Sequence, residues 1–160
     1  MKIGVPKEIK SQENRIGLTP ESVKILTSNG NEVMVENNGG FEAGFYNEQY
    51  KSAGAKIVDK AEDIFNDSEI IVKVKEPQSS EVKMIKENQI VFTYLHLAAA
   101  KELTKGLVDS KSVCIAYETV TDNNGRLPLL APMSAVAGRM SVQAGAPVSY
   151  THLRAHETQS

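Results

Sequence analysis

The chain has 160 residues, of which 41% are hydrophobic and 24% charged, and its formal net charge is −2. This length provides one sizeable core, and the composition is that of a soluble globular protein. Acidic and basic residues are interspersed, and a nucleic-acid or membrane-surface binder would need a basic patch, so we expect neither kind of partner.

The cysteine and hydropathy patterns favour a cytoplasmic protein. Cys114 is the single cysteine, which excludes a disulfide framework and a cysteine-based metal site. Its apolar surroundings, SVCIAYE, are typical of a buried small hydrophobic residue. No signal-peptide core is present, and no stretch approaches the roughly 18 apolar residues of a membrane span.

The first sixty-five residues alternate strand-like and helix-like segments. Thr19, Pro20 and Glu21 form a helix start, with a hydroxyl cap, a proline in the first turn and an early acid. The glycine-rich stretch 38–44 matches neither the dinucleotide fingerprint nor the P-loop, so we interpret it as a turn. We expect strands at Lys2–Val5, Glu32–Glu36 and Lys56–Val58, and helices from Pro20 to near Gly30, at Asn47–Ala53 and at Lys60–Phe65.

Three apolar runs follow, at Ser68–Pro77, Gln89–His96 and Ser112–Thr119. Such continuous runs are typical of strands buried on both faces of a parallel sheet. Helical segments at Ser79–Lys86 and Ala99–Val108 separate them, which gives βαβ units. The predicted fold class is therefore α/β, a mostly parallel twisted sheet with helices on both faces.

The chain changes character after a turn signal at 122–125. We expect a first domain over residues 1–128 and a connecting helix over 129–146, with Met133, Val136 and Met140 on one face. A core helix of the same domain is the alternative reading of this pattern.

Three polar side chains follow three different strands. Arg15 lies in the polar connection after the first strand, Lys75 ends the run before Pro77, and His96 ends the next run. Each alone has a plain alternative, as a solvated loop charge, a lysine paired with Glu76, and a boundary histidine. Because ligands of open parallel sheets bind beyond the carboxyl ends of the strands, the three together predict a site for a small anionic oxo or amino acid.

Six collinear segments carry a family resemblance over residues 1–146. They are MKIGVPKEIKSQENRIGLTPESV, GFEAGFYNEQYKSAGAKIV, IIVKVKEP, TYLHLAAAKELT, AYETV and LPLLAPMSAVAGRMSVQAGA. Together they resemble bacterial alanine dehydrogenases. The resemblance implies a Rossmann- or flavodoxin-like substrate domain, and reversible oxidative deamination of L-alanine to pyruvate and ammonia with NAD in L-alanine catabolism. It also implies a cytoplasmic homohexamer.

The same resemblance implies roles for individual residues. Arg15 and Lys75 would hold the substrate carboxylate and carbonyl oxygen, and His96 would be the general acid and base. Met133 would line the substrate pocket. Ser134 would approach the cofactor pyrophosphate, a role that the start of a helix suits.

The sequence departs from the family after Ala146. Family members continue into a glycine-rich nucleotide-binding domain that also supplies a catalytic aspartate. We therefore expect a fragment that is inactive alone, with NAD bound mainly by a domain absent from this chain. Two alternatives stay open: the corresponding domain of a proton-translocating transhydrogenase alpha subunit, and a stand-alone module that binds small oxo acids.

The last segment, 147–160, resembles a translated sequencing adapter, so we expect a non-native, disordered tail that begins where Pro147 breaks the helix. His152 and His156 have helical i, i+4 spacing. Because Leu153 stands where the zinc-protease motif needs glutamate, and a third ligand is missing, we expect no metal site.

Overall fold

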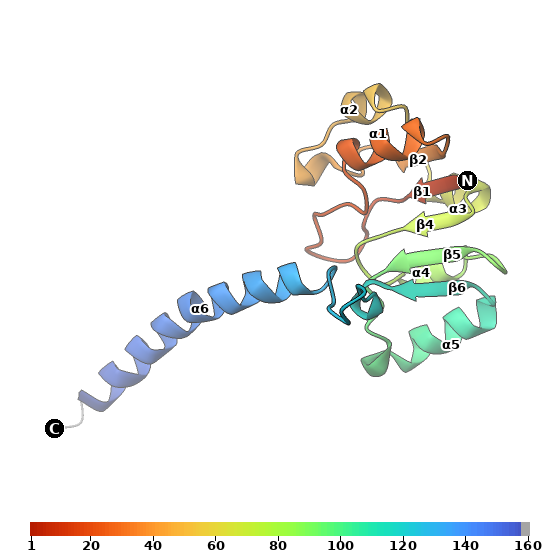
Figure 1. The fold of residues 1–160 in the computed structure, drawn as a ribbon. Coiled ribbons are helices and arrows are strands. Elements are labelled where there is room, and N and C mark those ends of the chain that lie inside the picture. Colours follow the sequence, from red (N-terminus) through yellow and green to blue (C-terminus); the bar gives the residue numbers. More distant parts are fainter. Residues whose placement is uncertain (158–160) are drawn as a thin grey trace. The chain divides into compact units, whose positions relative to one another are not determined.

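The computed structural model describes the backbone of residues 1–157 and the side chains of residues 1–146. Within that part of the chain, six parallel strands form one sheet in the order β3-β2-β1-β4-β5-β6 (Figure 1). The strands are β1 (Lys2–Val5), β2 (Glu32–Glu36), β3 (Lys56–Val58), β4 (Ile70–Val72), β5 (Ile90–Thr93) and β6 (Val113–Ala116). The predicted α/β fold with a parallel sheet is confirmed.

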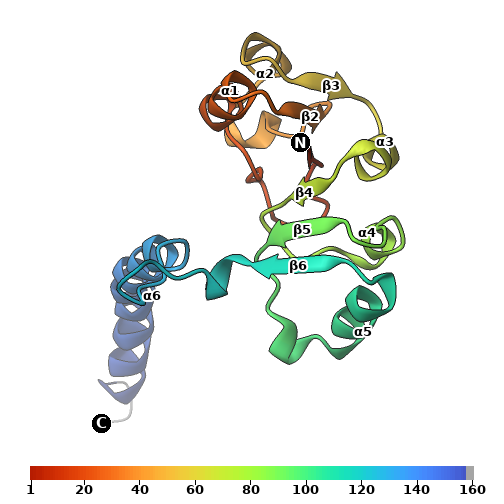
Figure 2. The same cartoon turned by 45° about the vertical axis from the view of Figure 1, so that its right-hand side comes forward.

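Helices connect the strands and cover both faces of the sheet (Figure 2). The α-helices are α1 (Pro20–Ser28), α2 (Asn47–Ser52), α3 (Ala61–Asp67), α4 (Ser79–Val82), α5 (Lys101–Ser110) and α6 (Ala131–Glu157). Short 3-10 helices are η1 (Phe41–Ala43), η2 (Leu97–Ala99) and η3 (Tyr117–Thr119). The predicted start of α1 is confirmed, because the Thr19 side chain accepts a hydrogen bond from the backbone N–H of Ser22.

Two apolar cores lie on opposite faces of the sheet, because alternate residues of a strand point to opposite sides. On one face, Val23 of α1 and Tyr50 of α2 pack with Val5 of β1. On the other face, Phe65 of α3 and Leu107 of α5 belong to a second core. Burial of these apolar side chains holds the helices against the strands and so fixes where each strand ends.

The glycine-rich stretch 38–44 forms turns, as predicted. Gly44 ends η1 with a φ of 83°, a conformation that glycine adopts without strain. At Gly40 a Cβ atom would lie 2.8 Å from the Tyr50 hydroxyl oxygen. The backbone here therefore needs the absence of a side chain in order to pack against α2.

The chain divides into two units, Met1–Tyr117 and Glu118–Ser160. The first holds the sheet and α1 to α5. In the second, the predicted turn is present, with the Asp122 carboxylate accepting from the backbone N–H groups of Asn124 and Arg126. The described side chains of α6, at 131–146, are all exposed.

Three strands differ from their predicted form. The apolar runs are longer than the strands within them, because β4 has only three residues and β5 and β6 have four each. Burial on both faces is wrong for β6, whose Val113 and Ile115 are exposed. β6 is an edge strand of the sheet, and the face that carries Val113 and Ile115 is left uncovered in the first unit.

The C-terminal helix also differs from its predicted form. Instead of ending before Pro147, α6 continues to Glu157. A proline removes one backbone donor, and here the helix continues past it. Residues 158–160 and the side chains of His152 and His156 lie outside the described part of the chain. The non-native origin of this tail stays a prediction.

Candidate functional site

The three predicted substrate-binding side chains follow three strands of the sheet. Arg15 lies between β1 and α1, Lys75 between β4 and α4, and His96 between β5 and η2. Because the strands are parallel, their carboxyl ends lie at one edge, and in Figure 1 the arrowheads point the same way. This is the edge at which doubly wound sheets bind ligands.

Arg15 forms a bidentate ion pair with Glu13. Its Nε donates to Glu13 Oε1 at 2.8 Å, and its Nη2 donates to Glu13 Oε2 at 2.6 Å. The side chain of Glu13 is 7% exposed and that of Arg15 is 42% exposed. These hydrogen bonds lower the pKa of Glu13 to about 2 and raise the pKa of Arg15. Glu13 thus fixes the orientation of a guanidinium group that stays accessible to solvent.

Lys75 is half-buried and its backbone is held on two sides. Its N–H donates to Glu8 Oε1 at 3.4 Å, and its carbonyl oxygen accepts from Thr93 Oγ1 at 3.0 Å. The charge of Lys75 also contributes to the low pKa values of Glu13 and Glu76. The ammonium group therefore lies close enough to both carboxylates to influence them.

His96 is exposed and has a left-handed backbone, with φ 50° and ψ 40°. This conformation is uncommon for residues other than glycine, although histidine adopts it more often than most. The imidazole stacks on the ring of Tyr94, with centroids 6.0 Å apart and an angle of 6° between the planes. The turn after β5 and the Tyr94 ring thus position the imidazole at the edge of the sheet.

Tyr94 belongs to an aromatic cluster with Tyr117 and Phe92. Tyr117 contacts Tyr94 edge to face at 4.9 Å between centroids, and it contacts Phe92 in the same way at 4.4 Å. Burial is the main cause that raises the pKa of Tyr117, and the nearby Glu8 adds to it. The phenol of Tyr117 therefore stays neutral at physiological pH and acts as a rigid support.

Two intermediary residues connect the predicted side chains. Glu13 is paired with Arg15 and also responds to the charge of Lys75. Tyr94 lies near enough to Arg15 to be among the causes of its raised pKa, and its ring stacks on His96. Arg15 and Lys75 thus share Glu13 as a neighbour, and Arg15 and His96 share Tyr94.

Sequence reasoning did not identify Glu8, Glu13 or Tyr94. Glu13 and Tyr94 each lie two residues before a predicted site residue, which places them in the same turn or strand end. That proximity was an available signal, although spacing alone does not indicate which way a side chain points. No local signal indicates Glu8, because its partners lie more than sixty residues away along the chain.

Met133 and Ser134 belong to the second unit and lie in the first turns of α6. Met133 is 43% exposed. The backbone N–H groups of both residues donate to the Leu130 carbonyl oxygen, and the Ser134 hydroxyl donates to the same oxygen at 3.4 Å. The amides at this position and the one proton of the Ser134 hydroxyl are therefore used within the helix. Both residues stay predictions for the substrate and cofactor sites.

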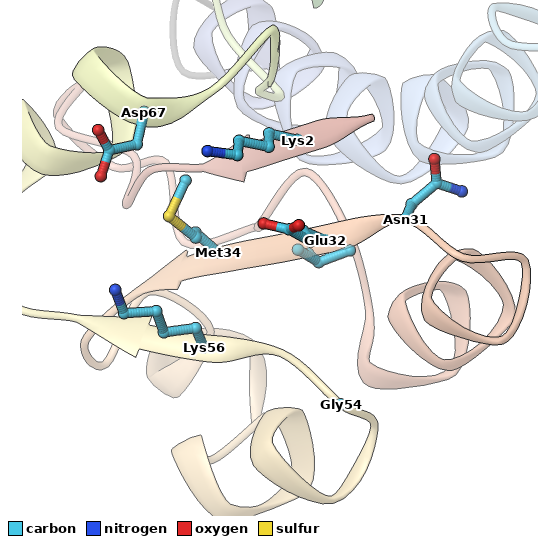
Figure 3. A pocket seen from close by; sticks show the side chains of 8 residues that line it. Lys2, Asn31, Glu32, Met34, Gly54, Lys56 and Asp67 are labelled. Carbon is cyan, nitrogen blue, oxygen red and sulfur yellow. The ribbon is translucent and has the colours of Figure 1, made fainter.

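A cavity of about 280 Å³ lies at the opposite, amino-terminal edge of the sheet (Figure 3). Lys2, Glu32 and Lys56, the first residues of β1, β2 and β3, line it together with Met34 and Asp67. Its ammonium and carboxylate groups balance one another, and it is remote from the predicted site along the strands.

None of the described helices is both long and apolar enough to cross a membrane.

Comparison with known proteins gives one consistent family. Residues 4–137 match the family described as alanine dehydrogenase/PNT, N-terminal domain. The chain is 56% identical over 146 residues to an alanine dehydrogenase of Staphylococcus epidermidis and 53% identical over 146 residues to one of Halomonas elongata. In both cases the matched region is 91% of this chain and 39% of the relative. The chain therefore spans about two fifths of the curated relatives that it matches.

Solved structures agree with the sequence matches. An L-alanine dehydrogenase structure superposes with a TM-score of 0.86 at 52% identity, over 92% of this chain and 40% of that one. A transhydrogenase from Sinorhizobium meliloti superposes with a TM-score of 0.72 at 24% identity, over 78% of this chain and 35% of that one. The second likeness shows a shared fold alone, whereas the first includes sequence identity at 52% of the aligned residues.

Proposed function

The chain belongs to the alanine dehydrogenase/PNT N-terminal domain family, and from this we propose that it forms the substrate-binding part of an NAD-dependent L-alanine dehydrogenase. The reaction converts L-alanine, NAD⁺ and water reversibly into pyruvate, ammonium, NADH and one proton. The supporting observation is the grouping of Arg15, Lys75 and His96 at the carboxyl edge of the sheet, connected through Glu13 and Tyr94.

Arg15 and Lys75 would bind the substrate through its oxygen atoms. A guanidinium group recognises a carboxylate in a planar, directional manner, and Glu13 already fixes the orientation of this one. The Lys75 ammonium adds a point charge that polarises the carbonyl oxygen of pyruvate. Both charges favour an anionic substrate and would draw electron density away from the carbon that reacts.

His96 would move the protons of the hydrolytic step. It takes a proton from the water molecule that attacks the imino carbon, and it returns that proton to the nitrogen that leaves as ammonia. Histidine suits this exchange because its ordinary pKa lies near neutral pH. Stacking on Tyr94 and the left-handed turn would hold the ring in place throughout.

NAD, when bound, would supply the acceptor for the hydride that leaves the α-carbon of alanine. From this chain the Ser134 hydroxyl would contact the cofactor pyrophosphate, and the Met133 side chain would line the substrate pocket. The remainder of the NAD site would come from a nucleotide-binding domain. The curated relatives are long enough to contain such a domain, because the matched region is only 39% of their length. For that reason we expect residues 1–146 alone not to turn over alanine.

The family resemblance supports further proposals for the whole protein. It would be a cytoplasmic homohexamer that acts in L-alanine catabolism. Its partners would be L-alanine, pyruvate and ammonia.

The test is alanine-dependent NADH formation by the full-length protein that contains this chain. Replacing His96→Ala should lower kcat by about 10²- to 10⁴-fold, the usual contribution of a general acid or base. Glu102→Gln, at an exposed position on α5, is the control and should retain kcat. Undiminished turnover in the His96 variant would remove the acid–base assignment, and absence of alanine-dependent turnover in the wild type would remove the proposed function.

A further inference from the structure

Glu8, Lys73 and Glu81 form a buried charge cluster. Glu8 follows β1, Lys73 follows β4, and Glu81 lies in α4. Lys73 Nζ donates to Glu81 Oε1 at 2.7 Å and to Glu8 Oε2 at 3.2 Å. The exposed fractions of the Lys73, Glu8 and Glu81 side chains are 0%, 1% and 3%. Burial of charges is costly unless they are paired and hydrogen-bonded, so a cluster with two carboxylates for one ammonium calls for a specific reason.

The two carboxylates hold different parts of the backbone. Glu81 Oε2 accepts from the N–H of Gln78 at 2.7 Å and thereby caps α4. Glu8 Oε1 accepts from the N–H of Val74 at 2.6 Å and from that of Lys75 at 3.4 Å. Lys73 connects the pair, but only Glu8 touches the backbone of Lys75.

Glu8 takes the place of a missing strand at this position. β1 pairs with β4 only at Ile70 and Ile71. Beyond Ile71, β1 supplies no backbone acceptor to the N–H groups that point toward it from the segment after β4. On the other side, Lys73 and Val74 still exchange backbone hydrogen bonds with the β5 segment. The Glu8 carboxylate satisfies the first side, where a buried N–H without an acceptor would be unfavourable.

From these contacts we propose that Glu8 is a positioning residue for Lys75, whose backbone N–H it holds at the carboxyl edge of the sheet. The inference rests on the proposed function, because it assumes that Lys75 binds substrate. Glu8 itself follows β1 in the same connection that carries Arg15. One buried carboxylate therefore ties together the two chain segments that deliver the two cationic groups.

The electrostatics agree with this role. Burial raises the pKa of Glu8, while the charge of Lys73 and the N–H of Val74 oppose that rise. Lys73 offsets one of the two carboxylate charges of the cluster, which lessens the repulsion of an anionic substrate at the nearby edge. Glu8 also adds to the causes that raise the pKa of Arg15, so its charge acts at the site as well as in the core.

Glu8 and Glu81 form a matched pair for the experiment. Glu8→Gln and Glu81→Gln each leave one acceptor oxygen and place an amide NH2 against either the Lys73 ammonium or a backbone N–H group, and only the first perturbs the acceptor of the Lys75 N–H. The dissociation constant of pyruvate is measured calorimetrically on the full-length protein with NADH and without ammonia, for wild type, for both variants and for Lys75→Ala. The free energy of unfolding is measured alongside.

We expect Glu8→Gln to weaken pyruvate binding about tenfold or more, because small displacements of a binding group are costly. For Glu81→Gln, the dissociation constant of pyruvate should stay within about twofold of wild type, even if this variant is destabilised as much as Glu8→Gln. In a Lys75→Ala background, the additional effect of Glu8→Gln should fall to about twofold or less, since the group that it positions is gone.

Equal effects of the two glutamine variants would overturn the inference, as would a Glu8 effect that persists without Lys75. If Glu8→Gln does not fold, Glu8→Asp and Glu81→Asp replace the pair, because they keep both charges while they withdraw one carboxylate at a time. The same comparison then decides. Failure of the proposed function looks different: wild type does not bind pyruvate, or Lys75→Ala binds it as wild type does.

Discussion

At the residue scale, the Arg15–Glu13 pair shows how a substrate-binding cation is oriented before the substrate arrives. An exposed arginine has many rotamers, and ordering it costs conformational entropy. Two side-chain hydrogen bonds to Glu13 order the Arg15 side chain before any substrate binds. The proposed role of Arg15 in substrate binding therefore depends on the planar, two-donor geometry of its guanidinium group as well as on its charge.

Replacing Arg15→Lys should raise the KM for pyruvate several-fold, because an ammonium cannot reproduce the planar, two-donor geometry. Steady-state kinetics of reductive amination by the full-length protein measure this. Arg126→Lys, at an exposed position of the second unit, is the matched control and should leave the KM unchanged. An unchanged KM in the Arg15 variant would exclude Arg15 from the substrate site.

Glu13 should also make stability depend on pH in an acidic range. Its pKa is about 2 in the folded chain, lowered from 4.5 mainly by hydrogen bonds from Arg15. A carboxyl group whose pKa falls on folding stabilises the protein above its unfolded pKa, and this contribution is lost as the pH falls through the folded value. The difference in unfolding free energy between wild type and Glu13→Gln should therefore shrink as the pH decreases from about 4.5 to about 2.

Urea unfolding at a series of pH values measures this difference. Glu48→Gln is the control, because that side chain is 79% exposed and its ion pair with Lys51 spans 3.7 Å. It should show no comparable trend. A difference for Glu13→Gln that does not change with pH would disprove the linkage.

Sequence reasoning identified Arg15, Lys75 and His96 because each follows a predicted strand, and parallel strands place their carboxyl ends together. It did not identify Glu8 and Glu13, because a glutamate in a polar connection resembles any solvated charge. The acceptor role of Glu8 exists only once β1 and β4 pair and leave two buried N–H groups. Such contacts between distant segments have no periodic signature.

At the element scale, Gly17 sets how closely the connection after β1 approaches β4. A Cβ atom at Gly17 would lie 2.6 Å from the carbonyl oxygen of Val72 and 3.2 Å from the backbone nitrogen of Lys73. Both are backbone atoms of the central sheet and cannot rotate away. The segment that carries Arg15 therefore needs glycine here in order to reach the carboxyl edge.

Gly17→Ala should lower the free energy of unfolding by about 1–3 kcal/mol, the usual cost of forcing extra volume into a packed region. Urea unfolding of the chain measures it. Gly138→Ala is the control, because nothing lies within 4 Å of a Cβ atom there and alanine favours a helix. A Gly17 variant as stable as wild type would show that the connection can shift without cost.

The sequence also predicted the order and type of most elements, because proline, glycine and apolar periodicity are local signals. Element lengths were less predictable. α4 has only four residues, where the pattern suggested a helix over Ser79–Lys86. The C-terminal helix passes Pro147. A sequence also does not reveal which face of a strand stays uncovered, so the exposure of Val113 was not expected.

At the scale of the whole molecule, the two units differ in what stabilises them. The first has two apolar cores around a sheet. The second has a long helix whose described side chains, at 131–146, are all exposed. Because helices in proteins gain most of their stability from packing, the two units should resist local unfolding to different degrees.

Hydrogen exchange of the 160-residue chain measures this difference. Amides of β1 and β4, inside the sheet, should exchange only on global unfolding. Amides of α6 over 131–146 should exchange much faster. Equal protection of the strands and the helix would show that α6 has stabilising contacts that its exposure does not reveal.

The whole account depends on where the substrate binds, and a crystal structure of the full-length protein with bound pyruvate tests that most directly. We predict the pyruvate carboxylate within about 3.2 Å of the Arg15 guanidinium nitrogens, and its carbonyl oxygen at a similar distance from Lys75 Nζ, with His96 facing the same carbon. Pyruvate bound away from this edge, for example in the cavity lined by Lys2 and Lys56, would contradict the account.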